Sequence, residues 1–292
     1  MKTSWTKSVL VIGIALASRA SVAEIESDVV YGHKDGLAMT MDVYRPDSNP
    51  NGAAVLFMVS GGWFSRWTPP EQALGMFHPY LDQGYTMIAV RHGSSPRYTI
   101  PEAVSDVRRA VRFVRKNAER FGIDPSRLGV WGMSAGGHLA LMLGTTGDDG
   151  DSDNSDLAAE DELDRVSSRV AAVVSLVPPT DLRVAVWEAP ESLPAYRAFP
   201  ALDLPMKDAA ANSPLLHVTK DDAPALVIMG GRDELVPAKH GRWIDAAFGK
   251  AGVACKLIIF PEAGHGLEGA ANRARLTQET LAWFGEYLLP EP

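Results

Sequence analysis

Continuous apolar runs recur along this chain, and segments with a helical pattern separate each run from the next. The run at residues 53–59 has no polar face, as a strand that is covered on both sides requires. Strands separated by helices pair in parallel, because parallel strands need a long crossover connection. Further buried strands are predicted at residues 85–90, 128–131, 170–176, 225–229 and 256–260. The alternation therefore predicts an α/β fold.

An opening hairpin is predicted from residues 29–31 and 37–44, where apolar and polar residues alternate around a glycine-containing turn. With this hairpin the sheet has about eight strands, mostly parallel, and helices on both faces. Helices are expected after residue 70 and at residues 100–121, 137–143, 238–251 and 272–288. No linker divides residues 24–292, which we expect to form a single domain.

Two stretches, residues 147–165 and 183–222, depart from the alternation. The first is rich in acidic residues, and the second is rich in proline and alanine. Open α/β sheets bind ligands at the C-terminal edge of their strands, and we expect both stretches to lie over this edge as loops. Residues 183–222 are interpreted as a small lid.

Residues 1–23 have the pattern of a cleaved secretory signal. Lys2 and Lys7 precede an apolar run at residues 9–17, which is too short to cross a bilayer as a helix. Ser21 and Ala23 place small side chains where a signal peptidase accepts them. We therefore expect a secreted or periplasmic protein without stable membrane insertion, and a retained membrane anchor is the alternative.

Composition and charge restrict the possible partners. With 46% hydrophobic and 22% charged residues, the chain has the composition of a globular protein rather than a fibrous or disordered one. The formal net charge is -8, and removing the basic signal segment makes it more negative. A negative protein repels phosphate backbones, so nucleic acid is excluded as an expected partner.

The segment Gly132-Met133-Ser134-Ala135-Gly136 follows a predicted strand and precedes a predicted helix. A serine at the tip of such a tight turn is held at strained backbone angles, with its hydroxyl above the edge of the sheet. Small neighbours let the helix and the strand approach closely. This context predicts that Ser134 is a nucleophile, and a glycine-rich turn that only joins two elements is the alternative.

A serine hydroxyl needs a base that accepts its proton, and the base needs an acid that orients it. His265 lies in a glycine-flanked loop after the last predicted strand, and Asp233 follows the strand before it. The chain order Ser134, Asp233, His265 is the order that this sheet topology uses. Glu234 and Asp222 remain alternatives for the acid.

The six other histidines are not predicted to act as the base. His138 lies on the helix after the nucleophile and is interpreted as a packing or hydrogen-bonding residue. His92 precedes the nucleophile in the chain, as do two further histidines.

A tetrahedral intermediate needs backbone N–H donors at its oxygen, and the loss of one donor lowers the rate by about 10²- to 10³-fold. Ala135 is predicted to supply one donor. Gly61 and Gly62, in the loop after the strand at residues 53–59, are predicted to supply the others, because glycines let a backbone turn its amides toward a site. Trp63 is either a wall of the acyl pocket or a core residue, and we include it as a candidate substrate-binding residue.

Several segments together match one group of enzymes. They are residues 55–63, 91–96, 121–125, 132–139, 181–182, 212–214, 233–237 and 264–266. On these residues the chain resembles the α/β-hydrolase carboxylesterases, among them hormone-sensitive-lipase-like enzymes and bifunctional feruloyl and acetyl-xylan esterases. The resemblance implies an α/β-hydrolase fold, oxyanion donors at Gly61 and Gly62, and ester hydrolysis without a cofactor.

One motif departs from this resemblance. Such esterases usually carry His-Gly-Gly-Gly-Trp where this chain has Val59-Ser60-Gly61-Gly62-Trp63. The change spares the backbone amides, but it leaves open what braces the loop and whether Ser60 contributes its hydroxyl.

The acidic stretch contains the spacing of a calcium-binding loop at positions 1, 3, 5, 7 and 12, occupied by Asp149, Asp151, Asp153, Ser155 and Glu160. Asn154 replaces the usual glycine, and paired flanking helices are not evident. We interpret residues 149–160 as a solvated acidic loop, and we expect neither a metal nor a cofactor.

The sequence therefore predicts a serine hydrolase that cleaves carboxylic esters through an acyl-enzyme. The expected substrate is a small-molecule or polysaccharide-linked ester, such as an acetylated or feruloylated plant polysaccharide. A peptidase or amidase resembling prolyl oligopeptidases shares the order of the three residues, but those enzymes usually add a large propeller for which this chain has no room. A binding protein that keeps the fold without activity is the third possibility.

Overall fold

The computed structural model describes residues 24–148, 161–187 and 199–289. The predicted signal, residues 1–23, the candidate calcium loop, residues 149–160, and part of the predicted lid, residues 188–198, lie outside the described residues, as do residues 290–292.

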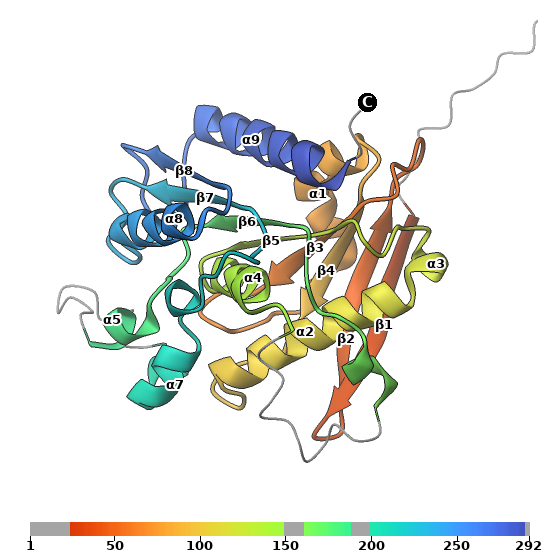
Figure 1. Ribbon diagram of the computed structural model, residues 1–292. Helices are drawn as coiled ribbons and strands as arrows, with labels where there is room; N and C mark the ends of the chain where they lie inside the picture. The colour runs from red at the N-terminus through yellow and green to blue at the C-terminus, as the bar shows by residue number, and fades with distance from the viewer. Residues whose placement is uncertain (1–23, 149–160, 188–198, 290–292) are drawn as a thin grey trace, which may run out of the picture.

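Within the described residues, one eight-stranded sheet has the order β1-β2-β4-β3-β5-β6-β7-β8 (Figure 1). The strands are β1 (Glu24–Lys34), β2 (Leu37–Arg45), β3 (Ala54–Val59), β4 (Thr86–Arg91), β5 (Leu128–Met133), β6 (Ala172–Leu176), β7 (Ala225–Gly230) and β8 (Cys255–Phe260). Strands β3 to β8 run in parallel, whereas β2 pairs antiparallel with both β1 and β4. The predicted mostly parallel sheet with an opening hairpin is confirmed.

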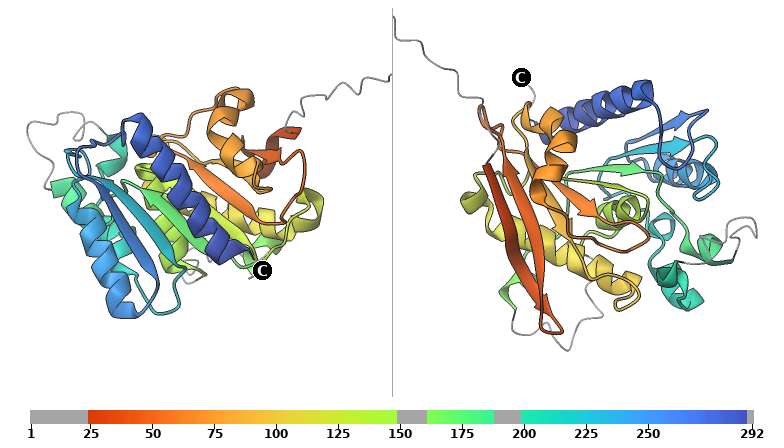
Figure 2. Two further views of the ribbon diagram at one scale, coloured as in Figure 1. Left: turned by 90° about the horizontal axis from the view of Figure 1, so that it is seen from above. Right: turned by 180° about the vertical axis from the view of Figure 1, so that it is seen from behind.

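Helices cover both faces of the sheet, as Figures 1 and 2 show. Helices α2 (Ile100–Lys116), α4 (Ala135–Thr146) and α8 (Lys239–Ala251) pack against one face, and α1 (Leu74–Leu81) and α9 (Ala270–Leu288) pack against the other. Shorter helices are α3 (Ala118–Phe121), α5 (Leu182–Trp187) and α7 (Met206–Ala211). Every residue of β4, β6 and β7 is buried, which explains why these strands are mostly apolar, with Thr86, Arg91 and Ser175 as the buried polar exceptions.

The helix predicted at residues 100–121 is two helices in the structure. A capping box starts α2, with the Thr99 hydroxyl accepting from the Glu102 amide and the Glu102 carboxylate accepting from the Thr99 amide. Asn117 ends it, because its side-chain amide donates to the Phe113 carbonyl and its backbone leaves the helical region. A second helix, α3, follows directly. It ends at Gly122, whose φ of 67° suits a glycine cap.

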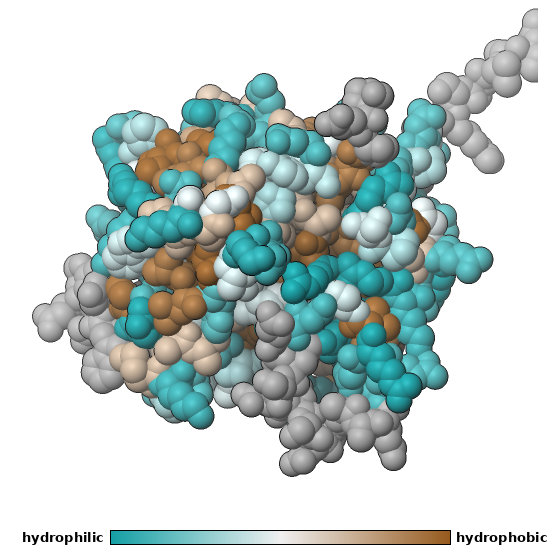
Figure 3. Space-filling model, viewed as in Figure 1, coloured by the Kyte–Doolittle hydropathy of each residue, from teal (hydrophilic) through white to brown (hydrophobic). Residues whose placement is uncertain are grey.

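The surface carries both hydrophobic and hydrophilic side chains. On the face in Figure 3, apolar residues form separate patches among hydrophilic ones. Among the helices of the described residues, none combines the length and the apolar character that a membrane span requires.

Candidate active site

Ser134 occupies the turn between β5 and α4 with φ 54° and ψ −121°, a strained conformation for a residue with a side chain. Two backbone hydrogen bonds hold it there. The Ser134 amide donates to the Leu176 carbonyl at 2.8 Å, and the Ser134 carbonyl accepts from the His138 amide at 2.9 Å. The surrounding strands and the helix therefore impose the strain.

Two glycines let this turn pass close to its neighbours. A Cβ atom at Gly132 would lie 2.2 Å from the carbonyl oxygen of Gly136, and one at Gly136 would lie 2.6 Å from the carbonyl oxygen of Met58. Both obstacles are backbone atoms, which cannot move aside as a flexible side chain can. The short turn between β5 and α4 thus requires glycine at both positions.

The structure brings Ser134, His265 and Asp233 into one chain of hydrogen bonds. His265 Nε2 lies 2.9 Å from Ser134 Oγ, and His265 Nδ1 lies 2.8 Å from Asp233 Oδ2. The Asp233 side chain is fully buried, and the His265 side chain is 25% exposed. Each residue follows the C-terminal end of a parallel strand, namely β5, β7 or β8, so the sheet gathers them at one edge.

Asp233 is oriented by backbone amides on its other oxygen. Its Oδ1 accepts from the amides of Leu235 at 2.9 Å and Val236 at 2.8 Å. The two alternatives for the acid lie elsewhere: Glu234 is exposed, and Asp222 accepts from Thr219. Asp233 is thus the carboxylate that contacts the imidazole.

Glu268 fastens the loop that carries His265. Its carboxylate accepts from the amide of Gly264 at 3.1 Å and from the amide of Gly266 at 3.0 Å. Hydrogen bonds from the Glu268 amide and from the Gly264 amide lower the pKa of this carboxyl group. The charged carboxylate therefore holds both glycines that flank the histidine.

The loop after β3 forms a tight turn, which changes the expected oxyanion donors. Gly61 and Phe64 exchange backbone hydrogen bonds at 3.0 Å in both directions, and Gly62 and Trp63 between them have φ values of 57° and 58°. Two positive φ values inside such a pair are typical of a type I′ turn. The prediction of Gly61 as an oxyanion donor is therefore wrong for this conformation, because the Gly61 amide already donates to the Phe64 carbonyl. In the part of the chain that the structure describes, the backbone amides of Gly62 and Trp63 donate no hydrogen bond.

His92 braces this turn, a role that was not foreseen in the sequence. Its Nε2 lies 2.8 Å from Ser60 Oγ, and its Nδ1 lies 2.8 Å from the carbonyl oxygen of Gly93. The Gly93 carbonyl can only accept, so Nδ1 carries the proton and Nε2 accepts from the Ser60 hydroxyl. Burial lowers the pKa of His92, which favours this neutral form.

The pairing of β3 with β4 explains why Ser60 and His92 meet. Strands β3 and β4 are parallel neighbours in which Val59 pairs with Arg91, so Ser60 and His92 are the next residues on the two strands. Finding the pair requires knowing that these strands are adjacent, which the alternation of apolar runs does not specify.

Trp63 lies in the core and is 4% exposed, so its alternative as a core residue is correct and its prediction as an open pocket wall is not. Its Nε1 donates to His138 Nδ1 at 3.2 Å, and His138 Nε2 donates to the carbonyl of Asn212 at 2.7 Å. Burial lowers the pKa of His138 to about 4, which keeps the ring neutral. The interpretation of His138 as a hydrogen-bonding residue agrees with these contacts.

Among the described residues, no group of three or more histidine, cysteine, aspartate or glutamate side chains is arranged to hold a metal ion. The candidate calcium loop lies outside those residues.

Comparison with known families agrees with this geometry. The model of one family, BD-FAE, matches residues 41–248, which is most of the chain. The chain belongs to the BD-FAE family. Its sheet order and its helices on both faces are those of the α/β-hydrolase fold.

Proteins similar to this BD-FAE member include esterases of bacteria. It is 29% identical over 266 residues to the esterase LipQ of Mycobacterium tuberculosis, covering 88% of this chain and 61% of LipQ. It is 28% identical over 266 residues to the acetylxylan esterase of Xylanibacter ruminicola, covering 88% of this chain and 50% of that enzyme. The chain thus spans only part of the length of these curated relatives.

A solved structure shares the fold over nearly its whole length. A truncated form of a carbohydrate esterase from gut microbiota superimposes with a TM-score of 0.76 at 25% identity, covering 92% of this chain and 98% of that one. The two chains therefore share the α/β-hydrolase fold.

Proposed function

We propose that this protein is a serine hydrolase that cleaves carboxylic esters through an acyl-enzyme. The observation that carries the proposal is the hydrogen-bonded chain from Ser134 Oγ through His265 to Asp233, with Ser134 held at a positive φ above the sheet. The esterases among its relatives support the same reaction class.

In the proposed reaction, Ser134 Oγ attacks the acyl carbon while His265 Nε2 accepts its proton. Asp233 accepts from Nδ1–H and stabilises the imidazolium that forms. His265 then gives the proton to the leaving alcohol as the ester bond breaks. A water molecule repeats these steps on the acyl-enzyme, which releases the acid and restores the Ser134 hydroxyl.

The oxyanion is assigned to the amides of Ala135 and Gly62. Ala135 is the first residue of α4, so its amide has no partner within the helix and lies at the positive end of the helix dipole. Gly62 lies in the turn braced by His92 and Trp63, and its amide donates no hydrogen bond to any of the described residues. Gly61 leaves this set, because its amide hydrogen is used within the turn.

We propose esters of plant polysaccharide, with acetyl or feruloyl as the acyl group, as the substrate. The names of the acetylxylan esterase and of the carbohydrate esterase support this class. Secretion or export to the periplasm through residues 1–23 would place the enzyme where such polymers occur.

The test is the substitution Ser134→Ala. It should lower kcat on p-nitrophenyl acetate by about four to six orders of magnitude, because the nucleophile is lost. A fluorophosphonate probe should label the wild-type protein and not the variant, and far-UV circular dichroism should be the same for both. Equal labelling of the two proteins would refute the proposed nucleophile.

Substrate comparison separates the other candidate functions. A panel of acetyl, butyryl, octanoyl and feruloyl esters reports the size of the acyl pocket through relative kcat/KM. Faster cleavage of proline p-nitroanilides than of any ester would favour the peptidase. A folded wild-type protein that takes up no fluorophosphonate would favour a binding protein.

A further inference from the structure

Phe199 lies against the turn that carries the proposed oxyanion donor. A Cβ atom at Gly62 would lie 2.5 Å from both Cδ1 and Cε1 of the Phe199 ring. The ring therefore faces the Gly62 backbone directly, and a side chain at position 62 would have to displace it. Phe199 is partly exposed, so its ring covers this side of the turn and still borders open space.

The chain after Phe199 is anchored beside the same turn. The short 3₁₀ helix η3 (Pro200–Leu202) follows Phe199 directly, and two of its residues are buried in the same hydrophobic core as Trp63. Further along, the Asn212 carbonyl accepts from His138, whose other ring nitrogen accepts from Trp63. The segment that carries Phe199 is thus tied to the turn at more than one point, which holds the ring in place.

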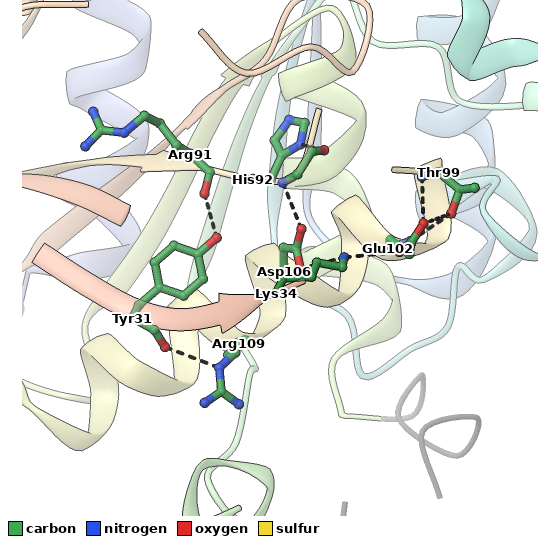
Figure 4. Close-up of polar contacts among 9 residues, drawn as sticks. Tyr31, Lys34, Arg91, His92, Thr99, Glu102, Asp106 and Arg109 are labelled. Carbon is green, nitrogen blue, oxygen red and sulfur yellow. Dashed lines mark hydrogen bonds and ion pairs between the residues drawn. The ribbon is translucent and has the colours of Figure 1, made fainter. Parts of the chain in front are cut away.

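The turn itself is a firm support for this ring. His92 braces it through Ser60, and the residue after His92 is fixed in turn. The Gly93 amide donates to Asp106 at 2.9 Å, Asp106 pairs with Lys34 at 3.1 Å, and Figure 4 shows the last two side chains between the hairpin and α2. A wall that is fixed before a ligand binds lowers the entropy lost on binding.

The order of the strands places the turn and the imidazole on opposite sides of Ser134. Gly62 follows β3, which is one neighbour of β5, whereas His265 follows β8, which lies beyond β6 and β7 on the other side. In the proposed reaction His265 protonates the leaving alcohol, so the alcohol part of the ester lies within reach of its Nε2. The acyl chain therefore extends from the acyl carbon on the side of the turn, toward Phe199.

A phenyl ring at this place limits the space for the acyl chain. An acetyl group adds only a methyl group to the acyl carbon, whereas longer chains extend toward the ring. A feruloyl group carries an aromatic ring that could stack on another, but a rigid vinyl linker holds it away from the acyl carbon. A stacking partner for it would lie farther from the oxyanion donors than Phe199 does, so this position favours exclusion of large acyl groups.

We propose that Phe199 is a wall of the acyl site and makes the enzyme prefer acetyl esters over esters of larger acids. The inference rests on the proposed function, since it places the acyl group beside the Gly62 amide that holds its carbonyl oxygen. It narrows that function from acetyl or feruloyl esters to acetyl esters. The ring takes no part in proton transfer, so its removal changes the choice of acyl group rather than the turnover of the smallest one.

Phe199→Ala tests the proposal on p-nitrophenyl acetate, octanoate and ferulate, which share one leaving group. The wild type should prefer the acetate. In the variant, kcat/KM for each larger ester relative to the acetate should rise by at least about tenfold, because the pocket gains the volume of several carbon atoms. Met206→Ala, which removes an exposed apolar side chain at the start of α7, is the matched control and should keep the wild-type ratios.

Phe199→Leu serves if the alanine variant fails to fold, since leucine keeps an apolar contact with the turn and is smaller than phenylalanine. It should change the ratios in the same direction by a smaller factor. A wild type that cleaves the octanoate or the ferulate faster than the acetate would overturn the inference, as would ratios that the folded Phe199 variants leave unchanged.

Acetates of ethanol, phenol and p-nitrophenol test the side on which the ring acts. Their relative kcat/KM values should be the same in the wild type and in Phe199→Ala, because only the alcohol differs. A change in these values with constant acyl ratios would place Phe199 on the alcohol side and overturn the assignment.

Fluorophosphonate labelling separates this inference from the proposed function. A wild type that is labelled at Ser134, with acyl ratios that do not respond to Phe199, would refute the acyl wall alone. A folded wild type that takes up no label and cleaves no ester would refute the proposed function, and the acyl wall with it.

Discussion

Single residues far apart in the chain brace the loop after β3, which carries the proposed oxyanion donor Gly62. Val59 stands where the esterases that this chain resembles usually carry a histidine, and an imidazole instead reaches the loop from His92, the residue directly after β4. Ser60, the second position at which the motif differs, donates its hydroxyl to that imidazole. Trp63 fastens the other side of the loop to His138.

The substitution His92→Phe tests this bracing. It removes the acceptor of the Ser60 hydroxyl, and we expect kcat on p-nitrophenyl acetate to fall by about tenfold to hundredfold with a smaller change in KM, because small displacements of catalytic groups are costly. His92→Gln should restore part of kcat, since its amide oxygen can accept from Ser60. His78→Gln, at an exposed position on α1, is the control. Unchanged kcat in His92→Phe would show that the loop needs no brace.

At the scale of elements, the ends of strands and helices can be predicted where a local sequence pattern fixes them. Strand β3 and helix α8 lie within one residue of their predicted bounds, because apolar continuity and helical periodicity are encoded locally. The break between α2 and α3 was not predicted, since it depends on how the Asn117 side chain bonds to the backbone. Helix α4 begins two residues earlier than predicted, directly after Ser134.

The close approach of α4 to the sheet leads to a prediction about Gly136. Gly136→Ala should lower the free energy of unfolding by about 1–3 kcal/mol, because the added Cβ meets the Met58 carbonyl at 2.6 Å. Gly285→Ala is the matched control, since a Cβ there meets no atom within 4 Å and the change should raise stability by up to about 1 kcal/mol. Urea unfolding measures both. Equal stability of the two variants would contradict the tight contact.

At the scale of the whole molecule, His138 links segments that are distant in sequence. It lies on α4, accepts from Trp63 after β3, and donates to Asn212, which follows α7. The segments at residues 181–182 and 212–214 also meet, as the Leu182 amide donates to Ser213 Oγ at 2.8 Å. Folding of the complete domain is therefore needed to form the braces of the site.

This link predicts a pH dependence of global stability. The pKa of His138 is about 4 in the folded protein and about 6.5 when unfolded, so the unfolded chain binds more protons between these values. Its contribution to stability is complete above about pH 6.5 and is lost as pH falls to about 4, by roughly 3 kcal/mol.

His138→Gln removes the titration but retains a donor and an acceptor in its amide. Guanidinium unfolding at pH 7 and pH 4.5 should show a smaller loss of stability for this variant than for the wild type. The same loss in both proteins would place the acid sensitivity elsewhere.

The amino-acid sequence alone was enough to predict the parallel sheet and to select Ser134, Asp233 and His265. Buried strands, periodic helices and glycine-flanked turns are local patterns, and the C-terminal ends of parallel strands meet at one edge. Only the tertiary structure decided which amides of the turn are occupied and which side chains brace it. Those contacts depend on β3 lying between β4 and β5, an order of strands that no local pattern specifies.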